Sequence, residues 1–168
     1  MRTFIAAIIL LFLPLTGVRA GDPAKQQASL KWKRLTAGMA EAKKANRKVL
    51  LDVYTDWCKW CKKLDEEVYA EPKVASYLGK NYVTIKLNAE STDTVTFQGK
   101  QSTEAELAQA FGVTGYPTII FIDPQGEPID KLGGFVNAEQ FLPIIRFIGD
   151  DTYKTTSWDE YQKKNGLK

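Results

Sequence analysis

Two cysteines offer the plainest chemistry in this sequence. Cys58 and Cys61 are its only cysteines and have two residues between them, in the run Cys-Lys-Trp-Cys. A disulfide across so short a loop removes little entropy from the unfolded chain, and a domain of this size does not depend on such a bond. The pair is therefore better explained by thiol reactivity than by structural cross-linking. The sequence contains no histidine, which excludes every mechanism that uses imidazole as base, nucleophile or ligand.

The residues around Cys58 favour a reactive thiolate. A strand is predicted to end before it and a helix to begin at it, so free backbone amides and the helix dipole would stabilise the thiolate. Asp56 opposes this effect, but three cations follow in the first turns of the helix: Lys59, Lys62 and Lys63. A thiolate of lowered pKa can attack a disulfide in another protein. Cys61 lies on the same helical face and can resolve the mixed disulfide.

Metal binding is the main alternative use of two cysteines. A structural zinc site takes four ligands, usually cysteine or histidine, and this sequence supplies two. A zinc site shared between two copies and a Cu(I) site made by two thiolates both remain open. We favour redox exchange and expect no metal site, because the cysteine motif follows a predicted strand and opens a predicted helix.

Hydrophobic periodicity predicts the elements that position this motif. Apolar or alternating runs predict three strands and an edge strand, over residues 48–54, 82–88, 118–122 and 128–132. Helical spacing and capping residues predict helices over residues 36–46, 58–69, 74–78, 103–112 and 137–149, with a short last helix after Ser157. Residues 89–102 are polar and aperiodic, and we expect them to form a loop.

This order of elements is typical of an α/β fold. A β-α-β crossover followed by a hairpin and a covering helix makes one mixed sheet of four to five strands, flanked by helices on both faces. Reactive sites in such open sheets lie beyond the carboxyl ends of the strands. Cys58 follows the central strand 48–54 and would lie at that edge.

The first 20 residues have the layout of a secretory signal peptide. Arg2 is followed by the apolar run 4–15, and small residues precede a cleavage site after Ala20. A retained membrane anchor is the alternative, but the run is too short to span a bilayer and contains Pro14. We expect a flexible segment over 21–29 and one domain over 30–168.

Charge gives no support for nucleic-acid binding. The full chain has a formal net charge of +3, and loss of Arg2 and Arg19 with the signal peptide would lower it to about +1. A near-neutral protein has no strong attraction to nucleic acid or to a membrane surface. We expect neither partner.

Three separated motifs resemble the thioredoxin superfamily from about residue 32 to residue 148. The first combines an aspartate with Trp-Cys-x-x-Cys-Lys, the second is a Lys-Leu-Asn strand, and the third is a Gly-Tyr-Pro-Thr loop. They are carried by Asp52, Trp57, Cys58, Cys61 and Lys62, then Lys86 to Asn88, then Gly115 to Thr118. The longer Trp-Cys-x-Trp-Cys-Lys-Lys run and the signal peptide resemble the exported branch, similar to the soluble terminal domain of periplasmic disulfide-reductant conduits.

The resemblance implies roles for residues outside the cysteine pair. Asp52 lies in an apolar strand, where burial would raise the pKa of its carboxyl group, and it could take the proton that Cys61 loses. The alternative is a structural ion pair with Lys86, and in the family both occur. The bond between Tyr116 and Pro117 would be cis, although sequence alone favours trans, and would turn the backbone toward an added client strand.

Aromatic side chains would surround the cysteines and bind clients. They are Trp57, Trp60 and Tyr116, of which we expect one or two to be core residues. Cytosolic thioredoxins have Gly-Pro between their cysteines, whereas this chain has Lys59 and Trp60. Its redox potential cannot therefore be transferred from them.

These observations predict a periplasmic thiol–disulfide oxidoreductase that reduces protein disulfides through Cys58 and Cys61. An oxidase or isomerase on the same scaffold, a Cu(I) carrier and a holdase are the alternatives. The sequence has no flavin or nicotinamide fingerprint, so we expect no cofactor and an electron-donating membrane redox protein as partner. We expect disulfide-bearing clients and a monomer.

Overall fold

The computed structural model describes residues 30–167, so the predicted signal peptide (1–20) and flexible segment (21–29) lie outside the described residues. No helix within that range has both the length and the apolar character needed to cross a bilayer. The elements in chain order are α1 (Leu35–Ala45), β1 (Lys48–Tyr54), α2 (Lys59–Leu64), the π-helical η2 (Asp65–Tyr69), α3 (Pro72–Asn81), β2 (Tyr82–Asn88), β3 (Thr94–Phe97), β4 (Lys100–Thr103), α4 (Glu104–Ala110), β5 (Thr118–Ile122), β6 (Pro128–Gly133), α5 (Ala138–Gly149), the 3-10 turn η3 (Thr152–Lys154) and α6 (Trp158–Asn165).

The central sheet has four strands in the order β2-β1-β5-β6. β1 pairs in parallel with β2 and antiparallel with β5, which in turn pairs antiparallel with β6. Pro128 begins the edge strand β6, where a missing backbone N–H is tolerated. The predicted mixed sheet is confirmed.

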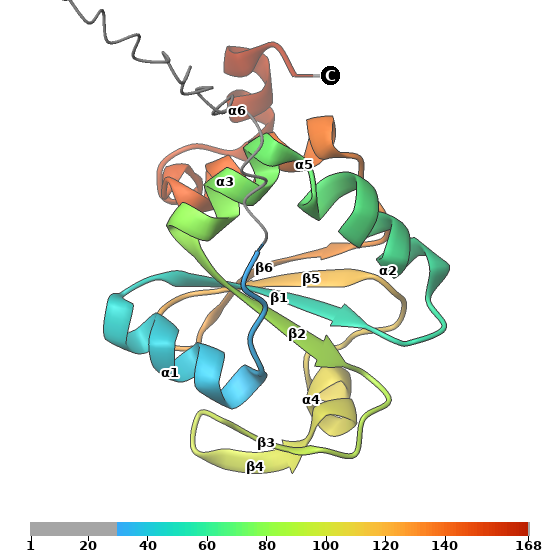
Figure 1. Cartoon of the computed structure of the whole chain (residues 1–168). Helices are drawn as coiled ribbons and strands as arrows, with labels where there is room; N and C mark the ends of the chain where they lie inside the picture. The colour runs from blue at the N-terminus through green and yellow to red at the C-terminus, as the bar shows by residue number, and fades with distance from the viewer. Residues whose placement is uncertain (1–29, 168) are drawn as a thin grey trace, which may run out of the picture.

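Alternating side chains along β1 fill both faces of this sheet. Val49, Leu51 and Val53 are fully buried in the cluster with α1 and α4, whereas Leu50 packs in the opposite cluster with α2, α3 and α5. Figure 1 shows these helices as layers on either side of the sheet. Because side chains alternate along a strand, Asp52 shares the face of Leu50 and lies on the side covered by α2.

The predicted loop over 89–102 is wrong, because part of it forms the hairpin β3–β4. Gln98 and Gly99 turn the chain with positive φ values of 49° and 77°, the backbone that a two-residue hairpin turn needs. Val95 is buried, and Phe97 packs against Phe111 with ring centroids 5.3 Å apart. The polar residues of β4 concealed this pattern in the sequence.

Two predicted helices also differ in extent. The helix predicted over 58–69 is α-helical only as far as Leu64 and continues as the π turn η2. The short helix predicted over 74–78 begins at Pro72, where proline suits the first turn, and the side chain of Glu71 caps it by accepting from the N–H of Val74 at 2.9 Å.

Candidate active site

Cys58 and Cys61 are joined in a disulfide at the start of α2. Cys58 is the N-cap residue, and its Sγ accepts the backbone N–H of Cys61 at 3.0 Å. An N–H aimed at a sulfur stabilises a thiolate there when the bond is reduced. Both cysteines are almost fully buried, with 4% and 2% of their surfaces exposed. A client must therefore come close against the surrounding surface to reach either sulfur.

A buried ion pair lies on the sheet face beneath α2. Asp52 and Lys86 are register partners on the parallel strands β1 and β2, so their side chains emerge side by side on one face. Lys86 Nζ contacts Asp52 Oδ2 at 2.5 Å, and Asp52 is fully buried. Burial raises the pKa of Asp52 to about 6, and the charge of Lys86 opposes that rise. The raised pKa and the pairing with Lys86 are thus both present.

The surroundings of Lys86 include residues that sequence reasoning missed. Its Nζ also contacts Asp65 Oδ1 at 2.6 Å and lies 4.7 Å from the ring centre of Trp32. Trp32 belongs to a segment that adds to the sheet edge through a parallel bridge between Lys33 and Ile85. Asp65 follows Cys58 by two helical turns, a spacing that could have placed it on the same face. No comparable spacing in the sequence would have placed Trp32 beside Lys86.

The aromatic residues predicted to surround the cysteines are mostly exposed. Trp57 is 64% and Trp60 is 55% exposed, so neither tryptophan is among the one or two core residues expected of the three. Tyr116 is half-buried and packs against the core. The rings make two pairs: Trp57 with Tyr116, 6.0 Å between centroids, and Trp60 with Phe135, 5.3 Å. These surfaces are open to a partner.

The loop before β5 reaches the same edge of the sheet. The register of β1 and β5 places Thr118 opposite Val53, so Pro117 lies near the carboxyl end of β1. The peptide bond between Tyr116 and Pro117 is cis, as the resemblance implied. The carbonyl of Pro117 already accepts the N–H of Gly134 at 2.8 Å.

The loop after β2 holds Trp57 in place. Trp57 Nε1 donates to Glu90 Oε1 at 2.9 Å, and the N–H of Glu90 donates to Asn88 Oδ1 at 3.0 Å. Glu104 is fully buried at the start of α4 and accepts the N–H of Asn88 at 2.9 Å. Its other oxygen lies 3.1 Å from Arg34 Nη2. Glu104 therefore fixes the loop that positions Trp57.

Replacing Glu104 with alanine should lower the free energy of unfolding by about 2–3 kcal/mol, because it leaves the Asn88 N–H without an acceptor. Glu104→Gln keeps an acceptor for that N–H, so its free energy of unfolding should fall by less. Urea denaturation of both variants measures the difference. Equal losses would mean that the charge near Arg34, rather than the Asn88 bond, is what matters.

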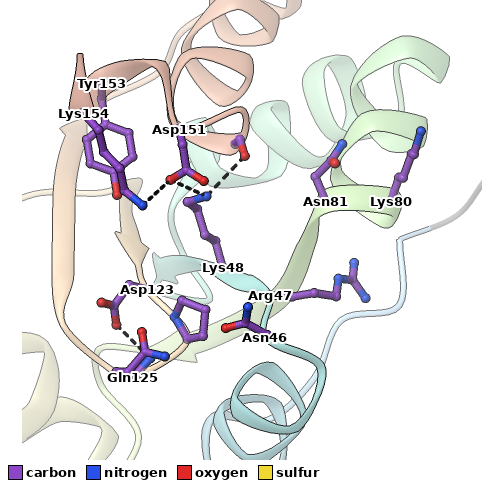
Figure 2. A pocket seen from close by; sticks show the side chains of 12 residues that line it. Asn46, Arg47, Lys48, Lys80, Asn81, Asp123, Gln125, Asp151, Tyr153 and Lys154 are labelled. Carbon is purple, nitrogen blue, oxygen red and sulfur yellow. Dashed lines mark hydrogen bonds and ion pairs between the residues drawn. The ribbon is translucent and has the colours of Figure 1, made fainter. Parts of the chain in front are cut away.

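A cavity of about 460 Å³ lies at the opposite end of the sheet. Lys48, the first residue of β1, lines it, and Figure 2 shows Lys48 and Lys154 both bonded to Asp151. Because β1 runs from this cavity toward the disulfide, the cavity is remote from the cysteines. Three of the cations that line the cavity, Arg47, Lys48 and Lys154, are bonded to groups of the protein itself.

Comparison with known proteins agrees with this geometry. A family model described as a thioredoxin-like domain matches residues 35–149. The chain belongs to the thioredoxin-like family. Among solved structures, this thioredoxin-like chain is similar to a thioredoxin-fold protein from Helicobacter pylori, with a TM-score of 0.59, 25% identity, and coverage of 71% of this chain and 80% of that one. A thioredoxin from Thermus thermophilus, with the same TM-score, 24% identity and coverage of 71% and 87%, shows the fold alone.

Curated relatives of the thioredoxin-like chain carry the name thiol:disulfide interchange protein DsbD. The protein from Vibrio vulnificus is 37% identical over 114 residues, which cover 67% of this chain and 18% of DsbD. The protein from Citrobacter koseri is 32% identical over 157 residues, 84% of this chain and 26% of DsbD. The chain thus spans about a fifth to a quarter of the length of these relatives. Family, fold and cysteine pair together support a thiol–disulfide oxidoreductase.

Proposed function

We propose that this thioredoxin-like protein reduces disulfides in other proteins of the periplasm. The observation that carries the proposal is a Cys58–Cys61 disulfide capping α2 above the buried Asp52–Lys86 pair. This arrangement supplies an attacking sulfur, a resolving sulfur and a proton acceptor of raised pKa. Exposed aromatic rings beside the sulfurs supply a surface for client chains.

The proposed reaction passes two electrons from the dithiol to the client. The thiolate of Cys58 attacks one client sulfur, forming a mixed disulfide and releasing the other client sulfur as a thiolate. Cys61 then gives its proton to Asp52, attacks the Sγ of Cys58 and releases the second client sulfur. The client disulfide is reduced and the Cys58–Cys61 disulfide is formed. Lys86 holds Asp52 in place throughout.

The compartment and the electron donor are part of the same proposal. The predicted signal peptide and the resemblance to relatives named for thiol:disulfide interchange support export to the periplasm. Because a reductase there must be reduced again after each turnover, we propose an electron-donating membrane redox protein as its partner. Acid-quenched thiol labelling of intact cells should then find the cysteine pair largely reduced.

Direct assays test the direction of transfer. The reduced protein should reduce insulin, and its potential should lie between about −270 mV, typical of reducing thioredoxins, and about −120 mV, typical of strong oxidants, nearer the reducing end. Lys59 raises the potential by stabilising the thiolate, but one cation shifts it only by tens of millivolts. A potential near that of strong oxidants, with the pair oxidised in cells, would reassign the protein as a dithiol oxidase. Stoichiometric Cu(I) binding without insulin reduction would point to a metal carrier.

A further inference from the structure

One flank of the disulfide is both apolar and cationic. Trp60 is more than half exposed and packs beside Phe135, and Lys63 Nζ lies 5.3 Å and 5.4 Å from the two ring centres. A lysine at that distance from two rings is held by cation–π attraction while its stem covers apolar surface. We call Trp60, Phe135 and Lys63 the aromatic platform.

Two further lysines extend this charge without acidic partners. Lys59 and Lys62 are exposed and share the side of α2 that carries Lys63, at helical spacings of three and four residues. Within residues 30–167 neither has a carboxylate at ion-pair distance, and Lys63 reaches Glu67 only at 3.7 Å.

Two carboxylates close to the cysteine motif in sequence are engaged with other residues. Asp65 contacts Lys86, and Asp56 accepts from the side chain of Asn88 at 3.4 Å. On the other flank of the disulfide, Trp57 is bonded to Glu90. Around the disulfide, and within residues 30–167, the lysines without an ion pair therefore lie on the flank with the aromatic platform.

Resting on the proposed function, we propose that this flank is a specificity subsite for clients that carry a carboxylate side chain and an apolar side chain beside the reacting cysteine. The client's apolar side chain packs on Trp60 and Phe135, and its carboxylate meets Lys59, Lys62 and Lys63. Because the subsite adjoins Cys58, it places the client sulfur as well as attracting the client chain. An anionic membrane would meet the same charge, but a flat surface would cover the disulfide rather than present a sulfur to it.

Matched peptide disulfides test the proposal. The two peptides differ only in having Glu or Gln beside the cysteine. For each peptide, the rate of reduction by the protein is divided by its rate of reduction by dithiothreitol, which corrects for the intrinsic reactivity of the peptide disulfide. At low salt the protein should favour the Glu peptide by about fivefold in kcat/KM, and about 0.5 M salt should largely remove the preference. The triple variant Lys59→Gln, Lys62→Gln, Lys63→Gln should bring the ratio close to one. Lys80→Gln, an exposed change at the far end of the sheet, should leave the ratio unchanged.

Trp60→Ala should raise KM for both peptides alike, since it removes the apolar contact and no charge. A ratio near one in the parent protein, or a preference that survives the triple substitution, would overturn the subsite while peptide reduction itself stood. Binding to anionic phospholipid vesicles without any peptide preference would also overturn it. Failure to reduce either peptide would reject the proposed function, and the subsite with it.

Discussion

Replacing Cys61 with serine should leave Cys58 joined to client proteins in stable mixed disulfides. Cys58 caps α2 and receives the Cys61 N–H at its sulfur, so its thiolate is the stabilised one and should attack first. Without a second thiol the mixed disulfide cannot be resolved. Steady-state reduction should be lost while covalent complexes accumulate. Non-reducing gels of cells that express the variant, followed by mass spectrometry, would display and identify those complexes.

Cys58→Ser is the matched control for that experiment. It keeps one thiol in the same site, but this thiol lies one turn further along the helix and is only 2% exposed in the oxidised protein. We expect no trapped clients. Trapping as efficient as with Cys61→Ser would exchange the roles of the two cysteines.

Asp52→Asn should stabilise the folded protein at neutral pH. The pKa of Asp52 rises from an ordinary value of 3.8 to about 6 on folding, so between these values the folded state binds more protons than the unfolded state. Stability therefore falls as pH rises through this interval and stays lower above it. An amide resembles the protonated acid, and the variant should gain about 1–3 kcal/mol at pH 7.5. The gain should shrink toward zero near pH 4.

Thermal unfolding across pH measures this difference. As a control, Asp130→Asn, which changes an exposed carboxylate on β6, should not reproduce the stabilisation expected of Asp52→Asn. A variant of Asp52 that is less stable at every pH would mean that the ion pair with Lys86 outweighs the burial of the charge.

The same substitution should slow one chemical step. An amide cannot accept the proton of Cys61, so decay of the mixed disulfide should slow by about a hundredfold, whereas its formation keeps a near-normal rate. Stopped-flow measurement with a fluorescent peptide disulfide separates the two steps. Equal slowing of both steps would assign Asp52 a purely structural role.

Local sequence patterns were sufficient to predict those strands and helix ends of this protein that depend on residues close together in the chain. The strand over 48–54 has the buried apolar run of a central strand, and that run already placed Asp52 among core residues. The capping residues before α4 and α5 were readable as well, because Thr103 and Asn137 accept the expected backbone N–H groups. Cys58 at the end of β1 followed from these elements.

What escaped prediction depends on contacts between distant segments. Asp65 meets Lys86 from the start of η2, and Trp32 meets it from a segment that precedes α1. The exposure of Trp57 and Trp60 likewise depends on how the surrounding loops pack, since an aromatic residue is usually core. The hairpin β3–β4 was missed because one of its strands is almost wholly polar.

The contact between the Trp32 ring and Lys86 has a consequence for where this domain begins. The matching family model starts at residue 35, after the strand-like segment in which Lys33 bridges to Ile85. A truncated protein cut at that boundary would keep both cysteines, Asp52 and Lys86. It would nevertheless expose Lys86 to water on the side that the indole now covers. The residues that enclose Lys86 therefore begin at least at Trp32, three residues before the family match starts.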